Sequence, residues 1–211
     1  MSNPSRRKTP EGTPEGETRV AQILTEAAIL FRDHGFAGAS MSDLARRVGV
    51  SKPALYHHFA SKEDLFVAVA TREPMETARR MASIAEDPNL AAGERLRLVL
   101  DCAYDNIILS MAGQMMPTIA EVSAQFPQIA RIFRDGFIAG QQDALLRILK
   151  DGMASGEFQS QDTAFMVELT FGPPIMLSIT RAMYGHLPDT PPMDLENAKR
   201  RHLAALMRVL T

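Results

Sequence analysis

The stretch "SMSDLARRVGVSKPALYHHFASKEDL" (residues 40–65) decides the fold, because it holds the starts and ends of several short helices. Ser40, with Asp43 three residues later, forms a helix start that resembles a capping box, and Gly49 stands where this helix ends. Pro53 lies in the first turn of the next helix, where the amide that proline lacks has no intrahelical acceptor. Two short helices therefore meet across a tight turn.

The spacing within this stretch is typical of a helix-turn-helix. Ala45, Gly49 and Leu55 occupy its small, glycine and aliphatic positions. The small residue lets the two helices approach, the glycine makes the turn, and the branched apolar side chain fills the core. Ser61 with Asp64 then predicts the start of a fourth helix.

The second of the two short helices presents an outward face without an acidic side chain. Leu55 and Phe59 are four residues apart and face the core, which turns three polar residues outward: Lys52, Tyr56 and His57. Each of these side chains can donate a hydrogen bond and none repels a phosphate, so the face suits phosphate oxygens and base edges. An ordinary solvated helix face explains the same residues equally well.

Residues 19–70 resemble the DNA-binding domain of the tetracycline-repressor (TetR) family. The resemblance lies in the Ala-x-x-x-Gly-Val-Ser turn at residues 45–51, the following Leu-Tyr-x-His-Phe at residues 55–59, and Ser-Lys-Glu at residues 61–63. It implies a transcriptional regulator with a three-helix DNA-binding domain and a second, helical domain for ligand binding and dimerisation.

The resemblance also implies DNA contacts at particular positions. Ser42 and Arg46 would contact phosphates, and Lys62 would hold the DNA backbone at the start of the fourth helix. Four residues would lie in or beside the major groove, namely Ser51, Lys52, Tyr56 and His57. Pro53 would supply an apolar contact to a thymine methyl group. For His58, an outward contact and a packed position remain equally open.

The charge distribution agrees with a nucleic-acid contact made by the N-terminal part. Residues 1–62 carry nine Lys+Arg against six Asp+Glu, whereas residues 63–211 carry fourteen against nineteen. Residues 1–18, with a tandem "TPEG", are too poor in apolar side chains to offset their ordering entropy and are predicted to be disordered. They are either a solvated tail or a basic arm that contacts phosphates.

Beyond the tail, apolar residues recur at three- and four-residue steps, and no sustained strand-like alternation is present. The first helix is expected from Arg19 to about Gly35. We therefore predict an all-α fold of about nine helices, with the helix-turn-helix domain at 19–66 and the larger domain at 67–211. Its helices are expected from Ser61, with Pro74 bending or interrupting the helix, and then at 91–111, 117–126, 127 to Gly152 or Gly156, 162–185 and 193–210.

The last two helices are expected to form the interface of a homodimer. The segment at about 161–184 is apolar on most of its circumference, and a modest domain cannot hide so much surface by itself. The segment at about 193–210 adds one apolar stripe. A twofold dimer places two recognition helices roughly 34 to 36 Å apart, so that each contacts half of a near-palindromic site.

The larger domain is also expected to hold a soft, apolar cavity for a hydrophobic or amphipathic effector. The candidate lining residues are Met81, Tyr104, Ile108, Met111, Met115, Phe137 and Phe165. Methionines at such spacings more often belong to plain core packing than to a ligand site.

Several functional classes are not supported by the sequence. Cys102 is alone, which excludes an internal disulfide and cysteine zinc sites, and the five histidines form no metal or catalytic pattern. No metal, cofactor or enzymatic activity is predicted. No signal peptide and no uninterrupted apolar run of roughly 18 residues is present, so we expect a cytoplasmic protein without a membrane span.

The sequence therefore predicts a ligand-responsive transcriptional regulator, a repressor that binds a DNA operator as a homodimer and is released by a small molecule. A helix-turn-helix protein that binds DNA constitutively, without a ligand, is the alternative.

Overall fold

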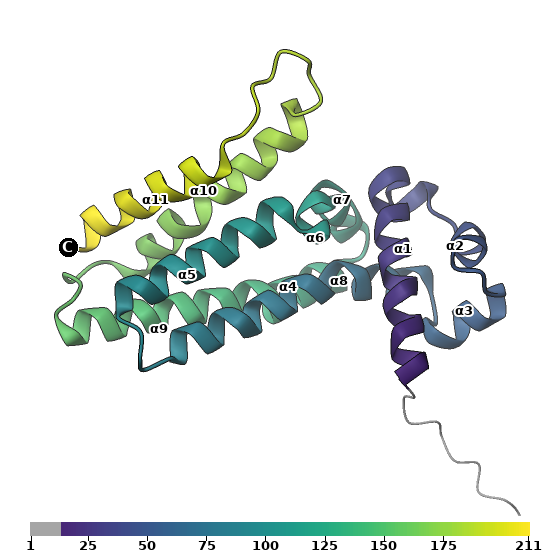
Figure 1. The fold of residues 1–211 in the computed structure, drawn as a ribbon. Coiled ribbons are helices and arrows are strands. Elements are labelled where there is room, and N and C mark those ends of the chain that lie inside the picture. The colour runs from purple at the N-terminus through teal and green to yellow at the C-terminus, as the bar shows by residue number, and fades with distance from the viewer. Residues whose placement is uncertain (1–13) are drawn as a thin grey trace, which may run out of the picture. The chain divides into compact units, whose positions relative to one another are not determined.

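The computed structural model describes residues 14–211, with side chains from residue 19 onward. The described residues are predominantly helical and contain no strand, which confirms the predicted all-α fold (Figure 1). The chain forms two compact units divided between Phe66 and Val67, called the N-terminal and the C-terminal unit below.

The N-terminal unit holds α1 (Pro14–Gly38), α2 (Met41–Val48), α3 (Lys52–His58) and the start of α4 (Lys62–Glu86). Helix α1 begins five residues before the predicted Arg19, so residues 14–18 of the predicted disordered tail are helical. A proline in the first turn already has a helical φ and loses no hydrogen bond there, which favours this start. The remaining tail, residues 1–13, lies outside the described residues.

Aromatic side chains organise the core of the N-terminal unit. The Phe66 ring makes edge-on contacts with Phe31 and Phe36, at centroid distances of 5.1 and 5.3 Å. Gly35, at φ 66°, interrupts the helical backbone of α1 at the position where the predicted first helix ends. Leu44 and Leu55, from α2 and α3, are buried in this unit. The short helices are therefore held by the apolar residues that the spacing had assigned to the core.

Helix α4 continues without interruption from the N-terminal into the C-terminal unit. Pro74 lies inside it, so the predicted interruption at this residue does not occur. Proline removes one backbone hydrogen bond, but its side chain is buried here, and packing of the flanking turns offsets that loss.

The described residues form ten continuous helical stretches, because the π-helical segment η1 continues α5 and the π-helical segment η2 joins α8 to α9. The additional stretch relative to the prediction is the four-residue helix α6. The C-terminal unit contains, after α4, α5 (Ala92–Tyr104), η1 (Asp105–Leu109), α6 (Met111–Gln114), α7 (Met116–Gln125), α8 (Pro127–Phe133), η2 (Arg134–Ile138), α9 (Ala139–Ser155), α10 (Thr163–Tyr184) and α11 (Leu195–Leu210).

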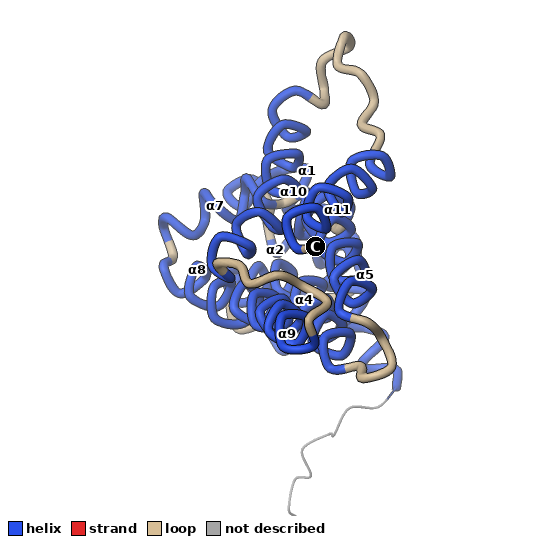
Figure 2. Tube along the Cα trace, turned by 90° about the vertical axis from the view of Figure 1, so that its left-hand side faces the viewer, coloured by secondary structure: helices blue, strands red, loops and turns tan. Residues whose placement is uncertain are grey.

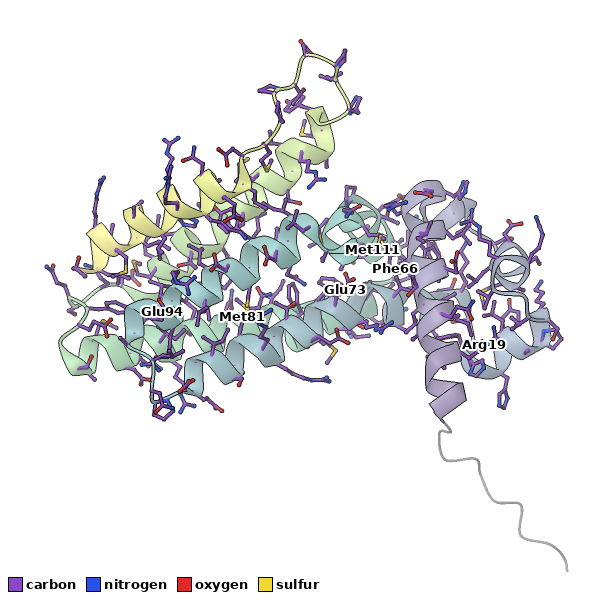
Figure 3. The ribbon with its side chains drawn as sticks, viewed as in Figure 1. Arg19, Phe66, Glu73, Met81, Glu94 and Met111 are labelled. Atoms are coloured by element: carbon purple, nitrogen blue, oxygen red, sulfur yellow. The ribbon has the colours of Figure 1, made fainter. Side chains whose placement is uncertain are left out.

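Side chains distant in sequence complete the ends of helices in the C-terminal unit. Helix α5 has no side-chain cap of its own, and Glu157 accepts hydrogen bonds from the backbone amides of Ala92 and Gly93, at 2.7 and 2.6 Å. Glu73, labelled in Figure 3, accepts one from the backbone amide of Ala112 at 3.2 Å. These carboxylates satisfy amides that a helix leaves unpaired at its start.

Helices α10 and α11 lie together on one face of the C-terminal unit, joined by a projecting loop (Figures 1 and 2). The apolar stripe of α11, predicted as a dimer surface, packs instead on the core of its own unit, where Leu206 and Leu210 are buried. The stripe is needed to close that core. The outer face of α11 carries Ala204, Ala205 and Val209 among arginines.

Helix α10 leaves much of its apolar surface exposed. It runs unbroken through Pro173 and Pro174, and its large exposed apolar side chains are Phe165, Ile175, Met176, Ile179, Met183 and Tyr184. By length and a mean hydropathy of 1.2, α10 is also the single helix among the described residues that has the character of a membrane span, although Glu168 and Arg181 interrupt its apolar run.

Candidate functional site

Helix α2 is capped as the sequence predicts. The Ser40 hydroxyl accepts a hydrogen bond from the Asp43 amide at 3.0 Å and donates one to the Asp43 carboxylate at 2.7 Å. That donated hydrogen bond and the nearby Arg46 guanidinium hold the pKa of Asp43 below its ordinary value, so its carboxylate stays charged beside the first turn. These contacts hold the first turn of α2 in place.

The turn between α2 and α3 depends on Gly49. Its φ of 73° and ψ of 35° lie in the left-handed region, which side chains other than glycine rarely adopt. The Val50 amide donates to the Ala45 carbonyl at 3.0 Å, which closes the turn. The Ser51 hydroxyl then accepts from the Ala54 amide at 3.3 Å, so Ser51 is the cap of α3. The conformation of Gly49 and these hydrogen bonds thus set the direction of α3 relative to α2.

Helix α3 is exposed along one side over its whole length. Leu55 is fully buried and Phe59 is half-buried, while the other side chains of the helix face solvent. The exposed set is Lys52, Pro53, Ala54, Tyr56, His57 and His58. His58, for which two positions had been open, lies on the exposed side, with its ring 5.7 Å from that of His57.

The other predicted DNA contacts lie beside this face or support it. Ser42 and Arg46 are exposed on α2, and Arg46 pairs with Asp43. Lys62 has its ammonium 4.5 Å from the centroid of the Phe36 ring, and burial lowers its pKa. Lys62 is therefore engaged with the protein's own aromatic cluster.

Arg47 is a basic residue that the sequence analysis did not select. It is exposed in the last turn of α2, next to Arg46 and just before the turn. The signal was present in the sequence, since the core positions Leu44 and Val48 leave both arginines outward at helical spacing.

The C-terminal unit contains an apolar cavity of about 470 Å³. Its walls come from η1, α7, η2, α9 and α10, and the lining residues are Ile107, Met116, Pro117, Ala120, Phe137, Ile138, Gln141, Gln142, Phe171, Ile175, Ser178, Ile179, Ala182 and Met183. The size and the apolar lining are typical of a small-molecule site. Both π-helical segments contribute, which agrees with the frequent occurrence of such segments at functional sites.

Of the seven residues predicted to line an effector cavity, Phe137 lines this one. Met81 (labelled in Figure 3), Tyr104 and Met115 are buried in the packed interior, and Phe165 is exposed on α10. Ile108 lines a separate cavity beside the loop that follows α10, and Met111, half-buried, lines neither of these cavities. The structure therefore does not bring these residues together around one cavity.

Comparison with known proteins gives a match to a family at the N-terminal end. The model for "Bacterial regulatory proteins, tetR family" matches residues 23–69, which include α2, α3 and the turn between them. Residues 23–69 are therefore similar to this family.

Two curated relatives are similar to part of the chain. The chain is 38% identical over 93 residues to the HTH-type transcriptional activator FasR of Mycolicibacterium smegmatis, covering 43% of this chain and 41% of FasR. It is 40% identical over 72 residues to the HTH-type transcriptional repressor AcnR of Corynebacterium diphtheriae, covering 34% and 36%. The chain thus matches about two fifths of the length of these relatives.

The likeness to a solved structure extends over both units. A transcriptional regulator FadR from Bacillus subtilis, in complex with stearoyl-CoA, superposes with a TM-score of 0.68 at 21% identity, covering 90% of this chain and 99% of FadR. At this identity the likeness establishes the fold.

Other candidate chemistry within the described residues is sparse. No group of three or more His, Cys, Asp and Glu side chains there is placed to hold a metal ion. Cys102 is buried, and burial raises the pKa of its thiol, which keeps it protonated and unreactive. The exposed face on α2 and α3 and the apolar cavity are therefore the two candidate functional sites among the described residues.

Proposed function

We propose that this chain is a ligand-responsive transcriptional regulator, a repressor that binds a near-palindromic DNA operator as a homodimer. The observation that carries the proposal is the exposed face of α3, where Lys52, Tyr56 and His57 present hydrogen-bond donors without an acidic neighbour on the same helix. A helix of this kind enters the major groove, where donors meet base edges and phosphates.

The basic residues around α3 are proposed to bind phosphates and so to position the protein on the DNA. Arg46 and Arg47 are exposed on α2, and a guanidinium binds phosphate oxygens with paired hydrogen bonds. Lys62, held over the Phe36 ring, contributes positive charge and orders the start of α4. The curated relatives include an activator and a repressor, and we propose repression as the direction for this chain.

The homodimer is proposed to form through α10 and the outer face of α11. Phe165, Met176 and Tyr184 are exposed on α10 and do not line the cavity, so they are free to be covered by a second copy. Ala204 and Ala205 on α11 are small enough for helices to approach closely. Burial of this surface removes a large apolar patch from water, which is the driving force for association.

The effector is proposed to be a hydrophobic or amphipathic small molecule bound in the 470 Å³ cavity. A bound stearoyl-CoA in the similarly folded FadR supports a ligand of this character. To release DNA, the effector must bind the conformation that does not fit DNA more tightly than the one that does. Helix α4 runs through both units and is the element proposed to transmit this difference.

DNA binding is tested by fluorescence anisotropy with duplexes selected from fragmented genomic DNA. Lys52→Ala is expected to weaken binding to every duplex and to lower the slope of log affinity against log salt by about one for each half-site, because one phosphate contact is lost. Lys150→Ala, an exposed lysine on α9, is the matched control and is expected to leave the slope unchanged. An unaltered slope for Lys52→Ala removes this residue from the interface.

Sedimentation and vesicle binding separate the proposed dimer from other uses of α10. We expect a dimer in solution and no co-sedimentation with lipid vesicles, as for a cytoplasmic regulator without enzymatic activity. Single chains in solution, or capture by vesicles, would contradict the proposed role of α10. Regulation without a ligand is the alternative, and it predicts DNA binding that no cavity ligand alters.

A further inference from the structure

The apolar cavity of the C-terminal unit is open to solvent along one side. Part of its lining consists of large apolar side chains that are exposed rather than buried, namely Met116, Ile138, Ile175, Ile179 and Met183. Small-molecule sites normally bury most of the surface of their ligand. An apolar molecule in the cavity of a single chain would keep part of its surface in water on this side, which lowers its affinity.

Two of these exposed residues also belong to a stripe along α10. The stripe, called the α10 seam below, follows alternating steps of four and three residues and consists of Phe165, Leu169, Gly172, Met176, Ile179 and Met183. This spacing is typical of a helix that packs lengthwise against another helix. Leu169 is half-buried, but the other members are exposed, Met176 to 63%. Most of the seam therefore has no partner helix within the described part of the chain.

The shape and charge of this surface suit a second copy of the chain. No atom lies within 4 Å of the position that a Cβ would take at Gly172, which leaves room for a helix to approach closely. Glu168, the single acidic residue of α10, lies next to the seam, and the outer face of α11 exposes Arg201 and Arg208. In a twofold dimer the same surface stands on both sides of the interface, so a surface with both charges can pair with itself.

We propose that the second copy closes the open side of the cavity, so that a ligand is enclosed between the two chains of the dimer. The inference rests on the proposed function, since it uses the dimer formed through α10. Ile179 and Met183 carry it, because they take part in both the cavity wall and the seam. A ligand that binds the dimer more tightly than the single chain must strengthen the dimer in return, so effector binding and dimerisation favour each other.

The test measures the affinity of the neutral dye N-phenyl-1-naphthylamine for the full chain as a dimer and as a single chain. Met176→Glu places a charge in the seam, and Met176 is exposed and does not line the cavity. We expect this variant to sediment as single chains and to bind the dye roughly tenfold more weakly than the wild type, because one side of the dye stays in water. Ile132→Glu, at an exposed residue of α8 outside the seam and this cavity, is the matched control and should match the wild type in both measurements.

A second measurement uses the wild type alone and does not depend on the folding of a variant. The dye affinity is determined at chain concentrations below and above the dissociation constant of the dimer. We expect it to increase in parallel with the fraction of dimer. At a fixed low chain concentration, saturating dye should shift sedimentation from single chains to dimers.

The outcomes separate this inference from the proposed function. Equal dye affinity of single chains and dimers, in Met176→Glu or in the dilution series, would overturn the inference and leave the dimer and its regulation in place. A wild type that never dimerises, or a Met176→Glu variant that remains a dimer, would overturn the inference together with the proposed interface. Failure of the dye to bind the wild-type dimer would overturn the enclosure of a ligand and leave the interface in place.

Discussion

The face on α3 and the cavity in the C-terminal unit differ in how their residues are distributed along the chain. The face and its support come from residues 40–62, where local spacing and two serine caps set the geometry. The cavity draws on five helical segments between Ile107 and Met183. A site made from consecutive residues leaves a pattern in the sequence, whereas a site made from distant segments depends on how those segments pack.

The largest expected effect on stability concerns two adjacent residues on α3. Leu55 is fully buried whereas Tyr56, beside it, is exposed. Leu55→Ala is expected to destabilise the protein by about 2–5 kcal/mol, because it removes a fully buried side chain and leaves a cavity. Tyr56→Ala is expected to change stability by less than about 0.5 kcal/mol while weakening DNA binding. Urea denaturation and anisotropy measure the two effects, and similar stability losses in both variants would contradict the assignment of core and face.

The long-range cap on α5 gives a test of intermediate size in the C-terminal unit. Glu157→Ala removes the acceptor for the amides of Ala92 and Gly93, and we expect a loss of about 1 kcal/mol in the free energy of unfolding, as for loss of a helix cap. Glu121→Ala, an exposed glutamate on α7, serves as the control and should change stability by less than about 0.5 kcal/mol. Equal effects in the two variants would show that the contact from Glu157 does not stabilise α5.

The smallest expected effect concerns a histidine that joins three helices of the C-terminal unit. The His202 Nε2–H donates to the Leu169 carbonyl at 2.9 Å, so Nδ1 accepts from the Tyr104 hydroxyl at 3.1 Å. Burial lowers the pKa of His202 below its ordinary value of 6.5, although the hydrogen bond to Leu169 opposes this shift. His202 therefore binds a proton less readily in the folded protein than in the unfolded chain.

The sign of the pH dependence follows from that difference. As the pH falls from 7.5 through 6.5, the unfolded chain binds a proton at His202 before the folded protein does, so stability is full above 6.5 and decreases below it. His202→Asn should make the decrease between pH 7.5 and 5.5 shallower in urea denaturation. Tyr104→Phe keeps the burial of His202 and should retain the decrease. A slope that is the same in wild type and His202→Asn would exclude this residue as a source of the pH dependence.

The elements that could be predicted from the sequence are those with local causes. Ser40, Gly49 and Ser51 act within a few residues of their own positions, and the predicted turn at Gly49 and the predicted cap at Ser40 are present in the structure. Helix starts were predicted less accurately where the local sequence signals are weak. The start of α1 at Pro14 was missed because the Pro- and Gly-rich composition of the tail outweighed a proline that suits a first turn.

The cavity illustrates why the rest was not accessible from the sequence. Met81 and Tyr104 have the size and softness of ligand-contacting residues, but the packing of α4, α5 and α11 places them in the interior. Gln141 was not selected, because a glutamine on a helix is usually solvated and nothing in its neighbours along the chain marks it as buried. Only the packed helices reveal that Gln141 is buried beside an apolar cavity.

The sequence by itself determined the helical fold, the turn at Gly49 and the polar face of α3, since caps, glycine conformation and helical periodicity act over a few residues. Tertiary structure decided which apolar stripes close the core and which stay exposed on α10. It also placed Glu157 at the start of α5 as a cap, and it brought the segments around Gln141 together to enclose a cavity. These features depend on packing between residues far apart in the chain, which no local pattern encodes.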